Sequence, residues 1–376
     1  MGINQLVYIR TDGNSQIATG HLVRCVSIAD ACLKLGMKVC FLVSDKESRE
    51  LLQAFLLSAL SAGPEHFTPL PSVSEASAAL NPDDLLSVRI LKTAVYDDLE
   101  KELPEITALL SDNPQLRETV FFLDSYYVTE KYLRAIRLYC RTAYLDDLRL
   151  FDYPVDLVVN YDVIPDKALS GYEKAYQKAG HTLLGASYTP LRSQFQNRQI
   201  SLRESVSDVL ITTGGSDPYH FCVRLIETMA EMNFNLHIVI GRLNTDKEKL
   251  YSLSKELPNI RLHENVTDMA ALMESCDLAV SAAGTTLYEL CALGVPTISF
   301  TMADNQLTAA KAFADTGSIP CAGDIRTSYE TILTSVLEFL TRMSENEVER
   351  KSAQESMNRL VDGNGAGRIA EAIRNL

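Results

Sequence analysis

The second half of the chain repeats one pattern, in which a short apolar run of strand length is followed by a longer amphipathic segment. This alternation predicts a parallel sheet, because two parallel strands need a long crossover that a helix usually supplies. The predicted strands are Val206–Thr212, Leu236–Ile240, Asn259–Leu262, Leu278–Ser281 and Thr297–Phe300. The predicted helices are Pro218–Met232, Asp246–Leu257, Thr267–Ser275, Thr285–Leu293 and Gln306–Thr316. The pattern is typical of an open, doubly wound α/β sheet.

The first half begins with the same kind of unit. A predicted helix over His21–Leu35 lies between two apolar, β-branched runs and ends at a glycine, as helices commonly do. The strands predicted for this half are Leu6–Ile9, Lys38–Val43, Val120–Leu123, Ala143–Leu145 and Val155–Val159, with a helix at Thr129–Tyr139. Residues 46–118 fit this scheme poorly, because a Pro-Leu-Pro at 69–71 and an Asn81-Pro82 pair interrupt them. We interpret much of that stretch as an insertion.

The 376 residues are enough for two domains. A polar stretch between about 185 and 205 has the composition of a linker, so we predict an N-terminal lobe at 1–190 and a C-terminal lobe at 191–376. The closing segment, 329–376, reads as helical with a break near 362–365, and its final helix is expected to return to the first lobe. Two Rossmann-like lobes of this kind predict a ligand cleft between the carboxyl ends of their strands.

Charge and hydropathy exclude several classes of function. The chain has 35 Lys and Arg against 49 Asp and Glu, a net charge of −14, and no basic stripe, so we expect no nucleic acid partner. No apolar run has the length of a membrane span, so we expect no membrane partner either. The N-terminal sequence does not read as a signal peptide, and the eight cysteines contain no Cys-x-x-Cys pair, so we expect a cytoplasmic protein. The oligomeric state is left open.

A first polar cluster, residues 10–21, lies between the first strand and its helix. Gly20 permits close approach of the backbone, and the helix start offers free N–H groups to a phosphate or a sugar. His21 stands at that helix start, where the positive end of the dipole favours a neutral imidazole that can serve as a base. The alternative is that His21 only caps or packs the turn.

Two further clusters lie at strand ends in the second half. Residues 211–218 carry Gly214 and Gly215 before Pro218, which suits either a diphosphate-cradling loop or an ordinary tight turn. Residues 281–289 place small residues before a helix, with Glu289 about one turn inward, where its carboxylate could accept both hydroxyls of a ribose. A solvated or core-lining glutamate is the alternative, but a polar cluster at 303–306 makes a nucleotide site the better interpretation.

These clusters carry a resemblance that follows the chain in order outside 46–118. The segments are residues 10–12, 20–25, 123–126, 213–218, 289–296 and 304–306. They resemble the UDP-2,4-diacetamido-2,4,6-trideoxy-β-L-altropyranose hydrolase family of pseudaminic acid biosynthesis, to which a group of spore coat polysaccharide biosynthesis proteins is related. The resemblance implies a glycosyltransferase-B-type fold, similar to that of the enzyme that adds N-acetylglucosamine to the peptidoglycan lipid precursor. It also implies that water takes the place of the sugar acceptor.

The resemblance also implies roles for residues. His21 would be the catalytic residue, with no metal and no cofactor required. The sugar of a UDP-sugar would face the first lobe, at Arg10, Asp12, Ser15, Gly20 and Tyr126. The uridine diphosphate would lie on the second lobe, at Gly214, Gly215, Ser216, Gly284, Thr285, Glu289, Asn305 and Gln306.

The expected reaction is hydrolysis of a UDP-linked, N-acetylated deoxy-sugar with inversion, in the synthesis of nonulosonic acid or surface polysaccharide. The motifs of the second lobe are shared with true transferases, so a glycosyltransferase of the same fold is a second hypothesis. A protein that binds a nucleotide sugar without turnover, with a structural His21, is a third.

Overall fold

The chain folds into two compact units. A computed structural model describes residues 5–17, 19–60, 85–112 and 118–376, with the side chains of 58–60 left aside. The first unit comprises Met1–Asp162, Asp166–Ser193 and Asn364–Leu376, and the second comprises Val163–Pro165 and Gln194–Gly363. The chain passes from the first unit to the second after Ser193 and returns to the first at Asn364.

The described part of the first unit forms a seven-stranded parallel sheet, in the order β3-β2-β1-β4-β5-β6-β7. The strands are β1 (Leu6–Thr11), β2 (Lys38–Val43), β3 (Leu86–Ile90), β4 (Thr119–Asp124), β5 (Arg141–Leu145), β6 (Leu157–Asn160) and β7 (His181–Leu184). The helices are α1 (Gly20–Lys34), α2 (Lys46–Leu60), α3 (Leu103–Ser111), α4 (Glu130–Arg137), α5 (Asp166–Ala175) and α13 (Gly365–Arg374), with a short 3-10 turn η1 (Leu99–Glu102).

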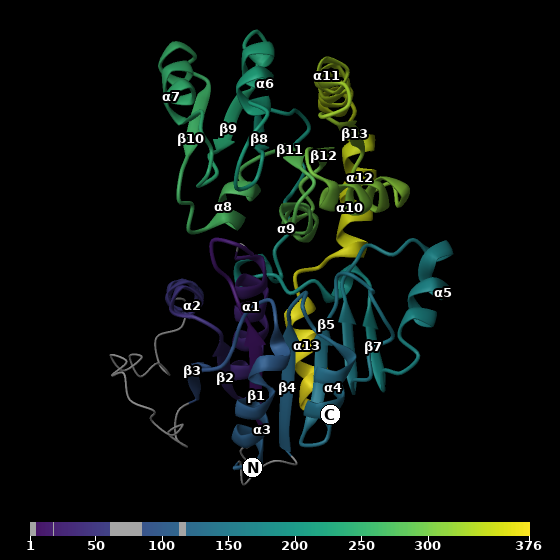
Figure 1. Ribbon diagram of the computed structural model, residues 1–376. Coiled ribbons are helices and arrows are strands. Elements are labelled where there is room, and N and C mark those ends of the chain that lie inside the picture. Colours follow the sequence, from purple (N-terminus) through teal and green to yellow (C-terminus); the bar gives the residue numbers. More distant parts are fainter. Residues whose placement is uncertain (1–4, 18, 61–84, 113–117) are drawn as a thin grey trace. The chain divides into compact units, whose positions relative to one another are not determined.

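Helices cover both faces of this sheet, because side chains alternate along each strand. Val7 and Ile9 of β1 point into a core that α1, α2 and α13 complete. Phe121 of β4 points to the opposite face, where its ring lies 6.5 Å from that of Tyr132 on α4. The last helix of the chain, α13, lies beside α1 in this unit (Figure 1). Ile369 and Ile373 of α13 are fully buried there.

The interpretation of residues 46–118 as an insertion is wrong for the part that the structure describes. Residues 46–60 form α2, and 86–90 form β3, the edge strand of the sheet. The sequence of β3, Leu-Ser-Val-Arg-Ile, does not read as a buried strand because every residue of it is only half-buried. The Pro-Leu-Pro and Asn81-Pro82 segments lie outside the described residues.

The described part of the second unit forms a six-stranded parallel sheet, in the order β10-β9-β8-β11-β12-β13. The strands are β8 (Asp208–Thr212), β9 (Asn235–Val239), β10 (Ile260–His263), β11 (Leu278–Ala282), β12 (Thr297–Thr301) and β13 (Cys321–Asp324). The helices are α6 (Phe221–Met229), α7 (Lys247–Glu256), α8 (Met269–Glu274), α9 (Thr286–Leu293), α10 (Asp304–Asp315), α11 (Tyr329–Glu345) and α12 (Glu347–Leu360). No helix of the described residues is long and apolar enough to cross a membrane.

The end of β1 is anchored by a buried ion pair. Arg10 and Glu102 are both fully buried, and the guanidinium donates from Nε to Oε1 at 2.8 Å and from Nη2 to Oε2 at 2.8 Å. The Tyr132 hydroxyl donates to the same carboxylate at 2.8 Å, so β1, η1 and α4 meet at one charge cluster. Breaking such a pair is costly because it leaves an uncompensated buried charge.

We therefore expect Arg10→Met to lower the free energy of unfolding by about 3–5 kcal/mol, measured by urea denaturation. The double variant Arg10→Met/Glu102→Leu should recover only part of this loss, because Glu102 is then no longer left unpaired but Asp12 still loses its cation. Arg134→Met is the matched control, since Arg134 forms an exposed pair with Glu130 on α4; its effect should stay within about 0.5 kcal/mol. A loss of similar size in the two arginine variants would contradict the argument.

Candidate functional site

In the first unit, the strand order reverses between β1 and β4, since β2 and β3 follow on one side and β5 to β7 on the other. Parallel α/β sheets open at such a switch point, and ligands bind there beyond the carboxyl ends of the strands. Thr11 pairs with Asp124 in register, so the loop after β1 and the end of β4 emerge side by side. The polar cluster at residues 10–21 therefore lies at the switch point of its sheet.

His21 and Asp124 form a hydrogen-bonded pair at this switch point. His21 is the second residue of α1, and its Nδ1 lies 2.6 Å from Oδ1 of Asp124. A carboxylate only accepts hydrogen bonds, so in the tautomer that carries its proton on Nδ1 the ring donates to Asp124 and keeps a lone pair on Nε2. The arrangement is that of a general base held in orientation by a carboxylate.

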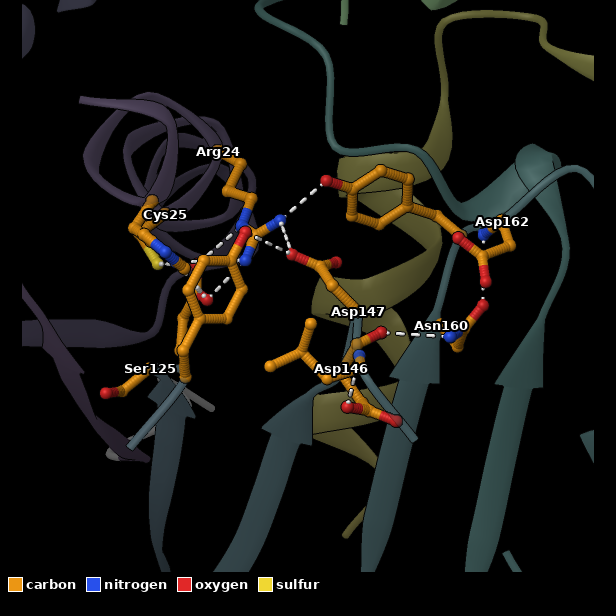
Figure 2. A network of polar contacts seen from close by, with 12 residues as sticks. Arg24, Cys25, Ser125, Asp146, Asp147, Asn160 and Asp162 are labelled. Carbon is orange, nitrogen blue, oxygen red and sulfur yellow. Dashed lines mark hydrogen bonds and ion pairs between the residues drawn. The ribbon is translucent and has the colours of Figure 1, made fainter. Parts of the chain in front are cut away.

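Arg24 joins this pair from one turn further along α1. Its Nε donates to Oδ2 of Asp124 at 2.6 Å and its Nη2 to Oδ1 at 2.5 Å, while Nη1 donates to Oδ2 of Asp147 at 2.7 Å. Figure 2 shows Arg24 reaching from α1 toward Asp147 in the loop after β5. Burial alone would raise the pKa of Asp124, but the charge of Arg24 and the hydrogen bonds from Arg24 and His21 hold this pKa well below its usual range.

Tyr126 lies directly against the imidazole. The two rings are 4.4 Å apart in an edge-on arrangement, and the Tyr126 hydroxyl donates to Oδ2 of Asp147 at 3.2 Å. His21 is only 5% exposed, whereas Tyr126 is 42% exposed. Tyr126 is thus an exposed aromatic side chain beside the buried imidazole of His21. A contact with a sugar would require such exposure.

The other residues predicted to touch the sugar divide into two groups. Arg10 is fully buried and bound to Glu102 and Asp12, so the prediction that it contacts a ligand is wrong. Asp12 is 5% exposed, and its carboxylate accepts from Arg10 and, at 2.7 Å, from the backbone N–H of Ser44. Its role in this structure is to fix the loop after β1.

Ser15 and Gly20, by contrast, are exposed. The backbone N–H of Ser15 donates to Oε1 of Glu47 at 2.9 Å, and a Cβ added to Gly20 would meet nothing within 4 Å. Both positions leave room for a ligand.

The second unit has its own switch point, between β8 and β11, where Thr212 pairs with Ser281. Gly214 follows β8 with a φ of +79°, a conformation that favours glycine. A Cβ on Gly241 would lie 2.2 Å from the carbonyl oxygen of Gly214 and 2.5 Å from that of Gly215. The loop 213–216 is therefore packed against the end of β9 at a distance that only glycine at 241 allows.

The helix after this loop starts later than the sequence indicates, at Phe221 rather than Pro218. The reason is Asp217, which is 1% exposed and accepts from the backbone N–H groups of Phe221 at 3.0 Å and Cys222 at 2.8 Å. A carboxylate already accepts the hydrogen bonds of this helix N-terminus, and its negative charge disfavours binding of a phosphate to α6. Only the backbone of Gly214, Gly215 and Ser216 remains as a phosphate-binding candidate there.

The N-terminus of α9 differs from that of α6. Gly284 and the exposed Thr285 precede the helix, and no side chain caps it. The N–H groups of Leu287 and Tyr288 donate to the carbonyls of Gly284 and Thr285 at 3.1 Å, so what this N-terminus offers an anion is mainly the positive end of the helix dipole. Glu289 is half-buried within this first turn.

The next loop precedes α10. Asn305 is exposed, and Oε1 of Gln306 accepts from the backbone N–H of Met302 at 2.9 Å. The helix itself has no side-chain cap at Ala303. Among the described residues, no three His, Cys, Asp or Glu side chains gather in a way that could hold a metal ion.

The two α/β lobes, each built on a parallel sheet with a switch point, define a glycosyltransferase-B-type fold. In the solved structures, MurG of Acinetobacter baumannii has this fold with a TM-score of 0.65 at 14% identity, over 99% of this chain and 100% of that one. Residues 209–363 match the glycosyltransferase family 28 C-terminal domain. The expectation of two lobes with parallel sheets is confirmed.

Two curated relatives share part of this sequence. The spore coat polysaccharide biosynthesis protein SpsG of Bacillus subtilis is 24% identical over 212 residues, which cover 55% of this chain and 60% of SpsG. The pseudaminic acid cytidylyltransferase and UDP-2,4-diacetamido-2,4,6-trideoxy-beta-L-altropyranose hydrolase of Helicobacter pylori is 31% identical over 135 residues, or 36% of this chain and 24% of that protein. The chain thus spans less than two thirds of the length of each of these relatives.

Four residues of these sites are absent from the predicted set, and the sequence holds a signal for only two of them. Asp124 directly follows an apolar run, at the position where a strand presents its last side chain to a ligand. Arg24 lies one turn after His21, on the same face of a predicted helix. Asp147 and Gly241 give no such signal, because their partners come from distant segments.

We expect the stability difference between the unmodified protein and Asp124→Asn to depend on pH. The pKa of Asp124 is lowered in the folded state, so the carboxylate stabilises the fold above about pH 4, the ordinary value for an unfolded chain. This contribution should be about 2–3 kcal/mol at neutral pH and should shrink as pH falls below about 4. Urea denaturation at several pH values measures it; a difference that stays constant with pH would contradict the assignment.

Proposed function

We propose that this chain hydrolyses a UDP-linked, N-acetylated deoxy-sugar and releases UDP, with inversion and without a metal. The observation that carries the proposal is the His21–Asp124 pair, which presents Nε2 as a base at the switch point of the first sheet. The partial matches to SpsG and to the H. pylori enzyme support nonulosonic acid or surface polysaccharide synthesis as the setting. Ser15, Gly20 and Tyr126 are the residues that we propose for the sugar.

The nucleotide would bind to the second lobe. The uncapped N-terminus of α9, with Gly284 and Thr285, suits a diphosphate, and Glu289 one turn inward suits the ribose hydroxyls. The remaining proposed contacts are the backbone of Gly214, Gly215 and Ser216, and the side chains of Asn305 and Gln306.

In the proposed reaction, a water molecule gives a proton to Nε2 of His21 while its oxygen bonds to the anomeric carbon. The bond from that carbon to the diphosphate oxygen breaks, and its electron pair leaves with UDP. Charge on the sugar ring resembles an oxocarbenium ion, and the leaving group becomes more negative. Backbone N–H groups at a helix N-terminus can stabilise this negative charge, so the chemistry does not depend on a metal.

A glycosyltransferase is the second candidate. It is favoured by the match of residues 209–363 to a glycosyltransferase family 28 domain and by the MurG-like fold. In that case, His21 would remove a proton from an acceptor hydroxyl instead of from water. The two candidates share the same base and the same donor, and they differ only in the nucleophile.

We expect purified protein to release UDP from a UDP-linked N-acetylated deoxy-sugar in buffer alone. In ¹⁸O-water, the label should appear in the hydroxyl group on the anomeric carbon of the released sugar. NMR should show the inverted anomer first. UDP release that needs an added organic acceptor would identify a transferase, and binding without turnover would identify a non-catalytic protein.

His21→Gln should lower kcat/KM by about 10²- to 10⁴-fold, the range typical for loss of a positioned general base. His181→Gln is the matched control, because His181 lies exposed on the edge strand β7. Both variants should bind UDP as the unmodified protein does. Equal activity of the two variants would contradict the role of His21.

We also expect Gly241→Ala to weaken binding of UDP at least about tenfold, measured by calorimetry, because its Cβ would push the backbone of Gly214 and Gly215 out of place. Gly367→Ala on α13 is the control, since a Cβ there meets nothing within 4 Å. Equal dissociation constants for the two variants would remove loop 213–216 from the nucleotide site.

A further inference from the structure

The guanidinium of Arg24 contacts both the imidazole of His21 and the carboxylate of Asp124. Nη2 of Arg24 lies 2.9 Å from Nδ1 of His21, so one cation stands against the imidazole and the carboxylate that orients it. Arg24 is mostly buried, with 11% of its side chain exposed, so solvent screens this charge weakly. The inference drawn below rests on the proposed role of His21 as a general base.

A carboxylate next to an imidazole has two effects that conflict in a general base. It fixes the tautomer and the direction of the ring, and it also favours the protonated ring, which cannot accept a proton. Asp124 is 1% exposed and hydrogen-bonded to His21 at 2.6 Å, so both effects are strong here. A cation bound to the same carboxylate opposes the second effect and leaves the first intact.

Arg24 has the geometry for this purpose. Nε and Nη2 of its guanidinium donate to the two oxygens of Asp124. Nη1 donates to Asp147 at 2.7 Å (Figure 2) and to the hydroxyl of Tyr161 at 2.6 Å. These two contacts hold the guanidinium from the side away from Asp124. The charged and titratable groups that face the pair are Arg24 and Cys25 from α1, Asp124 from β4, Tyr126 from the loop after β4, Asp147 from the loop after β5 and Tyr161 after β6.

We propose that Arg24 is a positioning residue that neutralises Asp124, so that the carboxylate orients His21 without favouring protonation of the ring. Asp147 and Tyr161 hold Arg24 in this position. The proposal predicts that the charge of Arg24, more than its bulk, decides how His21 titrates.

The test follows the His21 ring by NMR as pH is varied, in full-length protein, with His21→Gln to assign the signal. In Arg24→Met, the midpoint of the titration should move up by about 1–3 pH units, the usual effect of a neighbouring charge. In Arg24→Lys, which keeps a cation, it should stay within about 0.5 units of the unmodified protein. The control Arg134→Met, which removes an exposed cation of α4, should have no effect.

Asp124→Asn provides a second measurement that does not depend on the folding of Arg24→Met. It leaves Arg24 beside the ring without its counter-charge, so the midpoint should move down. A midpoint that is unchanged in Arg24→Met, or that is unchanged or higher in Asp124→Asn, would overturn the proposal.

Turnover separates this inference from the proposed function. If the chain hydrolyses a UDP-sugar, the acidic limb of its kcat/KM profile should move to higher pH in Arg24→Met by the same amount as the NMR midpoint. If no UDP-sugar is hydrolysed, the proposed function fails, but the NMR titration still decides whether Arg24 controls the ring.

Discussion

The site of the first lobe depends on one buried carboxylate, that of Asp124 at the end of β4. Its two oxygens accept hydrogen bonds from Arg24 and lie against Nδ1 of His21, so helix α1 and strand β4 are joined through it. A carboxylate this deep in the protein is stable only with such partners, since burial otherwise favours its neutral form. The orientation of the base and the stability of the lobe are therefore parts of the same ion cluster.

The two helix N-termini of the second lobe show how a single side chain changes what a loop can bind. At α6, Asp217 accepts from two backbone N–H groups and places a negative charge where a phosphate would bind. At α9, no side chain caps the helix, and small residues precede it. Both loops follow strands next to the switch point, so topology alone does not distinguish them. Electrostatics favours α9 for a diphosphate and leaves the glycine loop after β8 a supporting role.

The sequence predicted the fold well where burial produces a clear pattern. The strands at the centre of both sheets are buried and mostly apolar, and their alternation with helices was sufficient to identify two parallel sheets. The edge strand β10 was predicted, but the edge strands β3, β7 and β13 were missed, because they are half-buried or exposed and carry the composition of loops.

The site residues were likewise predicted well in some cases and not in others. His21 and Tyr126 lie next to each other, as two separate motifs suggested. Arg10 was misassigned because a charged residue at a strand end is typical both of ligand binding and of a buried ion pair. Only its partner Glu102, 92 residues further along the chain, distinguishes these cases.

The burial of His21 bears on the proposed choice between water and an organic acceptor. The residue is 5% exposed, with the ring of Tyr126 against its own, and the Tyr126 hydroxyl donates to Asp147. Asp147 also accepts from Arg24, so a displacement of Tyr126 that breaks its contact with Asp147 would act on the ion cluster around His21. Under the proposed role of His21 as a general base, this shared partner argues for a small nucleophile such as water over a bulky acceptor.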